Sequence, residues 1–208
     1  MTKLEREKHV LSLLEHDREI ARDSFRVAGI DEAGRGPLIG PVVAACVIMP
    51  LNAVPILWVD DSKKLSEKRR EMVYEEIVSS AVAVGVGSAS REEIDAINIL
   101  EATKLAMKRA AEQVEADLFL IDAVRDVGLK GMELPIVHGD AISYSIAAAS
   151  IVAKVTRDRQ MAEMDKIYPG YGLSKNKGYG TKEHIEALKS LGPCEEHRRT
   201  FIGHFVNL

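Results

Sequence analysis

Short apolar stretches, each bounded by turn-forming or charged residues, recur along this chain between longer segments of mixed polarity. Stretches of this length that are rich in valine and isoleucine are typical of buried strands. The predicted strands are Arg26–Asp31, Val42–Met49, Leu57–Val59, Ala81–Ser88, Asp117–Asp122 and Pro135–Val137. A Gly/Pro turn separates the first two strands, which predicts a hairpin.

Apolar residues at helical spacing, together with capping residues, predict helices between these strands. The expected helices are Leu4–Ile20, a segment capped by Ser66 and ending near Ser79, a region opened by the capping-box pair Ser90 and Glu93 and reaching about Glu115, Ile146–Val155, and His184–Ser190. The Gly- and aromatic-rich segment Tyr168–Thr181 is expected to be a loop.

The order of these elements predicts an α/β fold with a mixed central sheet flanked by helices. The length of 208 residues and a hydrophobic content of 46% suit one globular domain over residues 1–208. Within it we expect an N-terminal helix in residues 1–24 and a small helical C-terminal part from about residue 182 to residue 208.

Composition limits the setting in which the protein works. Cys46 and Cys194 are the two cysteines, too few for a disulfide framework, so we expect a cytoplasmic protein. No apolar stretch reaches membrane-spanning length, and the mixed charges of Thr2–Asp17 do not resemble a signal peptide.

The net charge of -4 argues weakly against a nucleic-acid partner, but it is unevenly distributed. Residues 141–208 carry 10 Lys/Arg and 7 Asp/Glu, whereas residues 1–140 carry 18 and 25. A basic part beside an acidic part fits a protein that grips phosphates with one region and holds metal ions with the other. Ordinary clustering of solvated surface charge explains the same numbers.

Three predicted strands end in an acid or lead directly to one. Asp31 and Glu32 close the first strand, Asp122 closes a later one, and Asp140 follows the last. Neighbouring strand ends can bring such residues together at one edge of a sheet. Four carboxylates would repel one another unless cations lie among them, so these acids are a candidate two-metal site for phosphodiester hydrolysis.

A Gly-Arg-Gly turn, Gly34-Arg35-Gly36, follows the first acid pair directly. Glycines let the backbone approach a ligand closely, and an arginine can meet a phosphate or anchor the turn. The turn is no P-loop, because the Lys-Ser/Thr pair that should follow is missing.

Two further loops offer groups for nucleic-acid contacts. Ser62, Lys63 and Lys64 supply a hydroxyl and two ammonium groups for phosphates, and Tyr179 lies between glycines in a lysine-rich segment where its ring could stack on a base or sugar. A polar loop before a capped helix, and a tight turn with a packed tyrosine, are equally good interpretations.

Histidines and the second cysteine give no clear metal signal. Cys194, His197 and His204 match no standard zinc spacing. His138 and His184 have no partner pattern, and we expect both to be structural.

Taken in order, these segments resemble the bacterial ribonuclease HII family, the type 2 ribonucleases H. The resemblance covers about Phe25 to Phe205. It rests on Gly29–Pro37, Asp61–Ser66, Ile121-Asp122, Gly139-Asp140, Ile146–Ile151, Ala153–Asp158, Tyr168-Pro169, Asn176–Thr181 and His197-Arg198. Leu173 and Asn176 depart from it, standing where an aromatic residue and a histidine are common.

The resemblance implies a ribonuclease H-like fold with a small helical C-terminal part. It implies an endonuclease that cuts the RNA strand of RNA–DNA hybrids, and that cuts duplex DNA 5′ of embedded ribonucleotides, leaving 3′-hydroxyl and 5′-phosphate ends. The family's metal-site acids fall on Asp31, Glu32, Asp122 and Asp140, with Mn²⁺ or Mg²⁺ as cofactor and two ions present when substrate is bound.

The same resemblance places the family's ribose-reading turn on Gly34, Arg35 and Gly36 and its junction-sensing tyrosine on Tyr179. A DNA resolvase or exonuclease on the same fold, and a non-catalytic hybrid-binding protein, remain as alternatives. We expect a monomer and no membrane partner. The tail Phe201–Leu208 shows no motif that identifies a sliding clamp as a partner.

Overall fold

The computed structural model describes residues 2–21 and 26–206. Residues 1, 22–25 and 207–208 of the predicted terminal segments lie outside the described residues. The elements in chain order are α1 (Lys3–Ala21), β1 (Val27–Ala33), β2 (Val42–Ile48), the 3-10 turn η2 (Ser62–Lys64), α2 (Glu67–Ser80), β3 (Ala83–Ala89), α3 (Arg91–Ala111), β4 (Leu118–Asp122), β5 (Met132–Ile136), the 3-10 turn η3 (Gly139–Ala141), α4 (Tyr144–Ile167), α5 (Leu173–Asn176), α6 (Lys182–Leu191) and α7 (Arg199–Ile202).

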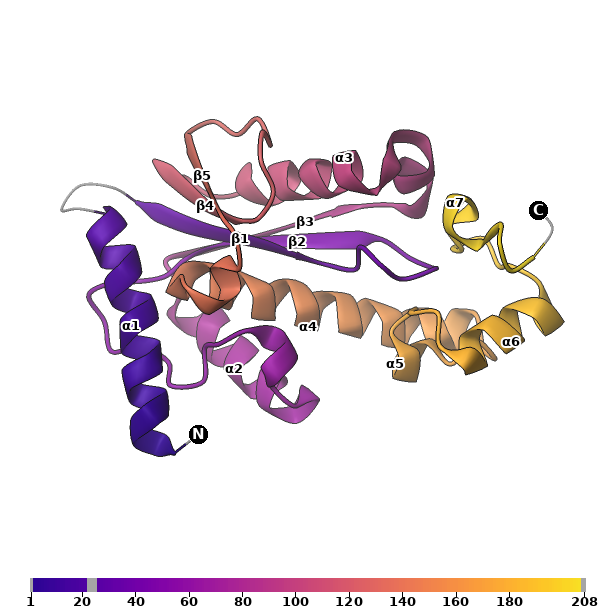
Figure 1. Ribbon diagram of the computed structural model, residues 1–208, viewed down its shortest axis with the longest axis horizontal. Helices are drawn as coiled ribbons and strands as arrows, with labels where there is room; N and C mark the ends of the chain where they lie inside the picture. The colour runs from indigo at the N-terminus through magenta and orange to yellow at the C-terminus, as the bar shows by residue number, and fades with distance from the viewer. Residues whose placement is uncertain (1, 22–25, 207–208) are drawn as a thin grey trace.

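The strands form one mixed sheet in the order β3-β2-β1-β4-β5 (Figure 1). β1 pairs antiparallel with β2, which pairs antiparallel with β3, so the predicted hairpin is confirmed. β4 lies parallel to β1, and β5 lies parallel to β4. The carboxyl ends of β1, β4 and β5 therefore lie at the same edge of the sheet.

Helices cover both faces of the sheet, and the predicted α/β class is confirmed (Figure 1). α3 packs on one face, while α4 crosses the other with α1 and α2 beside it. The start of α4 touches β1 directly, because a Cβ on Gly29 would lie 2.0 Å from the carbonyl carbon of Ser145. This contact fixes α4 directly beneath the strand that carries the first acid pair.

α4 is much longer than the predicted Ile146–Val155. The run of small residues marks only the half that is buried against the sheet. The second half is more polar, projects beyond the sheet and carries α5 and α6 at its far end (Figure 1). A single helix thus connects the sheet with the C-terminal part.

Other predicted boundaries need correction. Leu57–Val59 forms no strand: this segment packs beside α1 and α2, and the Tyr144 hydroxyl accepts the N–H of Ile56 (2.8 Å). β5 begins earlier than predicted, at Met132. The predicted loop Tyr168–Thr181 contains the short helix α5, and α7 lies within the predicted helical C-terminal part but was not predicted as a separate helix.

The helical region opened by the Ser90–Glu93 capping box contains a break that the sequence did not reveal. Asn98 has a φ of 67°, and its side chain accepts the N–H groups of Leu100 and Glu101. Asn98 therefore ends one short helix and caps the next. Among the described residues, no helix combines the length and apolar character needed to span a bilayer.

Candidate active site

The four predicted acids lie at the edge of the sheet where its parallel strands end. Asp31 and Glu32 are near the end of β1, and Asp122 is the last residue of β4. Asp31 and Asp122 are neighbours across the sheet, because the residues that precede them are paired in the parallel register. Asp140 lies in η3, soon after β5.

The acids interact electrostatically, and burial strengthens the effect. Burial, followed by the charges of Glu32 and Asp122, raises the pKa of Asp31 well above its ordinary value. Burial also raises the pKa of Glu32, against the opposing attraction of Arg35. The pKa of Asp140 is raised by burial and by two neighbouring aspartates. A cation among these side chains would relieve the repulsion.

Backbone hydrogen bonds orient two of the carboxylates. Asp31 Oδ1 accepts the N–H of Glu32 (2.6 Å), and Asp122 Oδ1 accepts the N–H of Gly139 (2.7 Å). The second bond ties the end of β4 to the turn that holds Asp140. A Cβ on Gly139 would lie 2.6 Å from Ile146 Cδ1, which shows how closely this turn approaches the side chains of α4.

Glu32 gives the clearest indication that the acids fit a metal ion. Its Oε2 is buried and has no hydrogen-bond partner, whereas its Oε1 lies 3.6 Å from Arg35 Nη1. A buried carboxylate oxygen without a partner is costly, and oxygen ligands of this kind suit Mg²⁺ and Mn²⁺. Within residues 2–21 and 26–206, no three His, Cys, Asp or Glu side chains are grouped closely enough to hold an ion alone.

Arg198 supports the Gly-Arg-Gly turn from beneath. This fully buried guanidinium donates to the carbonyl oxygens of Gly34 (2.7 Å), Arg35 (3.0 Å) and Pro37 (2.9 Å). Burial lowers its pKa to about 9, so it remains charged at neutral pH. The turn is therefore held through its carbonyl groups, while Arg35 and Gly36 remain exposed.

A second buried arginine, Arg157 of α4, occupies the space behind the turn. Gly34 has a φ of 99°, and a Cβ there would lie 2.0 Å from Arg157 Nε. The guanidinium donates to the carbonyls of Ile39 (3.2 Å), Pro41 (3.1 Å) and Lys177 (2.8 Å). Arg157 thus joins the segment after the turn to the loop that carries Tyr179.

Tyr179 lies beside the turn, and its side chain is 44% exposed. A Cβ on Gly36 would be 3.5 Å from Tyr179 Cε1, an ordinary van der Waals distance. The N–H of Leu38 donates to the carbonyl of Gly178 (2.8 Å), which links the two segments through their backbones. The structure therefore brings the predicted turn and the predicted tyrosine together.

The three residues predicted to contact phosphates, Ser62, Lys63 and Lys64, differ in their burial and in the groups that they contact. Ser62 is buried and accepts a hydrogen bond from the Ser150 hydroxyl (2.8 Å). Lys63 is exposed, and its Nζ lies 3.6 Å from Asp140 Oδ2. Partial burial opposes the charge of Lys63, but nearby carboxylates, Asp140 first, raise its pKa. Lys64 instead pairs with a buried aspartate of its own loop (3.0 Å).

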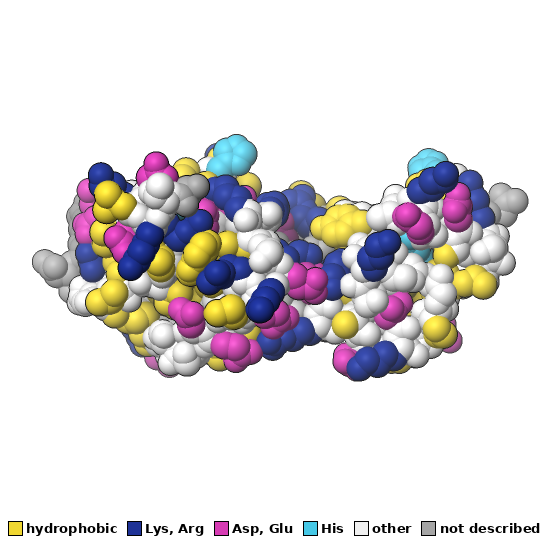
Figure 2. Space-filling model, turned by 90° about the horizontal axis from the view of Figure 1, so that it is seen from below, with side chains coloured by type: hydrophobic (Ala, Val, Ile, Leu, Met, Phe, Trp, Pro, Cys, Tyr) yellow, Lys and Arg dark blue, Asp and Glu magenta, His cyan; other side chains and the backbone are white. Residues whose placement is uncertain are grey.

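On the face of the molecule shown in Figure 2, the charged side chains of the described residues do not form a patch of one sign. In Figure 2, Lys and Arg side chains are interspersed with Asp and Glu along the whole length of that face. The charge excess of residues 141–208 is therefore not gathered there into a surface of one sign.

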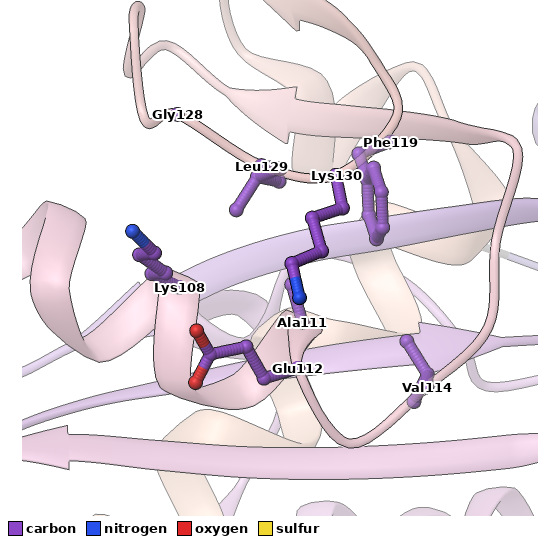
Figure 3. A pocket seen from close by; sticks show the side chains of 8 residues that line it. All are labelled: Lys108, Ala111, Glu112, Val114, Phe119, Gly128, Leu129 and Lys130. Atoms are coloured by element: carbon purple, nitrogen blue, oxygen red, sulfur yellow. The ribbon is translucent and has the colours of Figure 1, made fainter.

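A pocket of about 300 Å³ lies away from these residues, between the end of α3 and the loop before β5 (Figure 3). It is lined by Lys108, Ala111, Glu112, Val114, Phe119, Gly128, Leu129 and Lys130. No predicted site residue lines it. The acids, the turn and Tyr179 occupy a separate site, formed from strand ends and neighbouring loops.

Comparison with known proteins decides the family. Residues 28–207 match the ribonuclease HII family. The chain belongs to the ribonuclease HII family. It is 51% identical to ribonuclease HII of Caldanaerobacter subterraneus over 96% of this chain and 84% of that protein. It is 52% identical to ribonuclease HII of Lachnoclostridium phytofermentans over 91% and 75% of the two chains.

Solved structures of the family share the fold. Ribonuclease H2 from Pyrococcus horikoshii matches with a TM-score of 0.72 and 28% identity, over 84% of this chain and 92% of that one. Ribonuclease HII from Archaeoglobus fulgidus, in a complex with PCNA, matches with a TM-score of 0.70 and 30% identity, over 84% and 93%. This member of the ribonuclease HII family is accordingly a ribonuclease H, an endonuclease acting on RNA–DNA hybrids.

Sequence reasoning did not assign Arg157 and Arg198 a role, although both lie in segments that resemble the ribonuclease HII family. Their partners are backbone carbonyls that lie up to 164 positions away along the chain. The sequence carries little signal for either role, because Arg157 stands among the charged residues Lys154, Asp158 and Arg159 and so looks like an exposed position.

Proposed function

We propose that this ribonuclease H cleaves duplex DNA on the 5′ side of embedded ribonucleotides, in addition to the RNA strand of hybrids. The observation that carries the proposal is the position of Gly34–Gly36, which follow Asp31 and Glu32 closely in the chain and lie beside the partly exposed ring of Tyr179. Only the 2′-hydroxyl distinguishes a ribonucleotide in a DNA duplex, so its recognition needs close backbone contact. A glycine turn held from behind by Arg157 and Arg198 provides that contact without side-chain obstruction.

The metal-binding residues in this proposal are Asp31, Glu32, Asp122 and Asp140. Two bound Mg²⁺ or Mn²⁺ ions would supply an activated water and stabilise the leaving oxygen, giving 3′-hydroxyl and 5′-phosphate ends. Glu32 contributes its unpartnered Oε2, and Asp31 and Asp122 are held by backbone N–H groups. Asp140 completes the set from a separate turn, where it helps place the second ion or the water.

Substrate positioning belongs to the surrounding loops. Arg35 and the backbone of the turn contact the ribose and its phosphate, and Lys63 beside Asp140 neutralises an adjacent phosphate. Lys64 adds charge to the same loop, and the buried Ser62 fixes its conformation. Tyr179 packs against the next sugar, where a second 2′-hydroxyl would be crowded, and this favours an RNA-to-DNA step.

The test is cleavage of a labelled DNA duplex that contains one ribonucleotide, beside an all-DNA duplex and with Mg²⁺, Mn²⁺ or EDTA. We expect a metal-dependent cut 5′ of the ribonucleotide and no cut in the control. Asp122→Asn should reduce the rate by more than about a thousandfold while the far-UV spectrum stays native. Normal turnover by this variant would contradict the four-acid site.

The same experiment separates the alternatives. Cutting of both duplexes would indicate a general DNA nuclease that does not read the 2′-hydroxyl. Tight binding without cutting would indicate a hybrid-binding protein, which the family assignment already argues against.

A further inference from the structure

Two buried histidines, His184 of α6 and His197, lie in contact behind the Tyr179 loop. Their side chains meet through Nε2 atoms 3.3 Å apart. His184 Nδ1 lies 3.0 Å from the carbonyl oxygen of Tyr179, and His197 Nδ1 lies 3.0 Å from the backbone nitrogen of Cys194. The four groups form one continuous chain of hydrogen bonds.

The backbone groups at the two ends determine where the protons are. A backbone N–H can only donate, so Cys194 makes His197 Nδ1 an acceptor and leaves the hydrogen of a neutral ring on Nε2. That hydrogen points to His184 Nε2, which must accept it. The hydrogen of His184 is then on Nδ1 and is donated to the carbonyl of Tyr179. One arrangement of two neutral rings satisfies these three contacts, and in it His197 Nδ1 can also accept a weak hydrogen bond from the Cys194 thiol, whose Sγ lies 3.2 Å away.

The surroundings keep both rings neutral. His184 and His197 are 0% and 1% exposed. Burial lowers the pKa of His184, and burial together with the neighbouring ring lowers that of His197 to about 4. The edge of Tyr171 packs on His197 with ring centroids 4.9 Å apart. A proton on either ring would place two N–H groups face to face and break the chain of bonds.

His197, at the far end of this series of hydrogen bonds, lies next to Arg198, the residue that holds the Gly-Arg-Gly turn. His197 pairs with Ile39 across an isolated bridge, and the next residue, Arg198, binds the carbonyls of Gly34, Arg35 and Pro37. Two consecutive residues therefore hold the two segments that we propose recognise the ribonucleotide. Arg198 holds the turn, and His197, acting through His184, holds the Tyr179 loop.

We propose that His184 and His197 are positioning residues that set the distance between the Tyr179 ring and the Gly34–Gly36 turn, and through it the choice of an RNA-to-DNA junction. This inference rests on the function proposed above. The geometry goes beyond ordinary packing, because the chain of bonds ends on the carbonyl of Tyr179 itself rather than on a neighbouring residue.

Two substitutions at His197 separate positioning from packing. In His197→Asn, the amide oxygen takes the place of Nδ1 but the side chain is too short to reach His184. In His197→Gln, the amide nitrogen takes the place of Nε2 and can still donate to His184. The measured quantity is the ratio of kcat/KM on a single-ribonucleotide duplex to kcat/KM on a continuous hybrid.

We expect this ratio to fall about tenfold in His197→Asn, the size expected for one lost hydrogen bond, and to recover largely in His197→Gln. In a Tyr179→Ala background, His197→Asn should change the ratio no further, since its effect passes through Tyr179. A parallel loss on both substrates that follows Tm, or an additive loss in the double variant, would overturn the proposal.

A spectroscopic measurement tests the chain of bonds without any cleavage. Nitrogen NMR of ¹⁵N-histidine-labelled protein should show His184 with its hydrogen on Nδ1, His197 with its hydrogen on Nε2, and no protonation of either ring at neutral pH. Titration of either ring near its ordinary value would overturn the inference. A wild type that ignores embedded ribonucleotides would instead overturn the proposed function and the effect on substrate choice, while the NMR result would still decide the bond chain.

Discussion

At the scale of single residues, the acids of the site work against the stability of the metal-free protein. Asp31 is 5% exposed, and burial and neighbouring charges disfavour its ionised form. A carboxyl group with a raised pKa binds its proton more tightly in the folded state than in the unfolded chain. It therefore weakens the fold at neutral pH, and stability returns as the pH falls below the folded pKa.

Replacing Asp31 by asparagine removes this repulsion and keeps the shape of the side chain. We expect Asp31→Asn to raise the free energy of unfolding by about 1 kcal/mol without metal, and to abolish cleavage. Excess Mn²⁺ should raise the Tm of the wild type and have much less effect on the variant. The measurement is thermal unfolding with Mn²⁺ and with EDTA.

The matched control is Asp126→Asn, at an exposed aspartate with a φ of 55°, a conformation that asparagine tolerates well. It should leave both Tm values near those of the wild type. An Asp31→Asn protein that is less stable than the wild type in EDTA would contradict the repulsion.

Tyr179 can be tested separately, because its ring is partly exposed and lies over the turn rather than in the core. We expect Tyr179→Ala to reduce the preference for embedded ribonucleotides about tenfold, and to cost less than about 1 kcal/mol of stability. The ratio of cleavage rates on the two substrates measures this preference. Tyr179→Phe keeps the ring and should keep the preference; equal losses in the two variants would contradict a contact made by the ring.

At the scale of elements, α1 docks through polar contacts as well as apolar ones. The fully buried Asp17 accepts the N–H of Ser145 (2.8 Å) in the first turn of α4. At the other end of α1, Arg6 lies 3.5 Å from the ring centroid of Trp58, while Arg69 of α2 lies 4.0 Å from it. α1 lies before the family match at residues 28–207, yet it holds the start of the helix beneath β1.

We expect Asp17→Ala to lower the free energy of unfolding by about 1–2 kcal/mol, because it removes a capping carboxylate from the N-terminus of α4. Chemical denaturation measures this loss. Glu19→Ala, at an exposed acid of the same helix, should change stability by less than about 0.5 kcal/mol. Equal effects of the two substitutions would show that Asp17 does not act as a cap.

Local patterns predicted elements well, and long-range contacts explain the failures. The Ser90–Glu93 capping box and the apolar strand runs were correct because their partners lie within a few residues or repeat along the segment. The predicted strand Leu57–Val59 was wrong because a strand must pair with the open edge of a sheet, and this segment packs against helices instead. The roles of Arg157 and Arg198 in holding the turn could not be predicted from local patterns, because the carbonyl groups that they bind are distant in the chain.

At the scale of the whole molecule, the buried histidines make stability depend on pH. In the unfolded chain a histidine takes up a proton near pH 6.5, whereas folded His197 does so only near pH 4. Between these values the unfolded state binds more protons, so stability falls as the pH falls. The acids with raised pKa values act in the opposite sense and are shared by wild type and histidine variants.

We expect His197→Asn to be less stable than the wild type near pH 7.5, and this difference to shrink as the pH falls towards about 5. The slope should be at most about 1.4 kcal/mol per pH unit for the one histidine removed. Denaturant titrations at intervals of half a pH unit measure the difference. Parallel stability curves would show that His197 is not held neutral by the fold.

The hydrogen bond from Arg198 to the carbonyl of Gly34 joins residues 164 positions apart, and this separation also has a consequence for protein synthesis. A ribosome makes the acids of β1 early and the guanidinium beneath the turn late. Until Arg198 has left the exit tunnel, the growing chain can carry part of its acidic edge but cannot complete the support of the turn. We therefore expect a nascent chain to gain substrate discrimination only after Arg198 has emerged from the ribosome, later than the acids of the site.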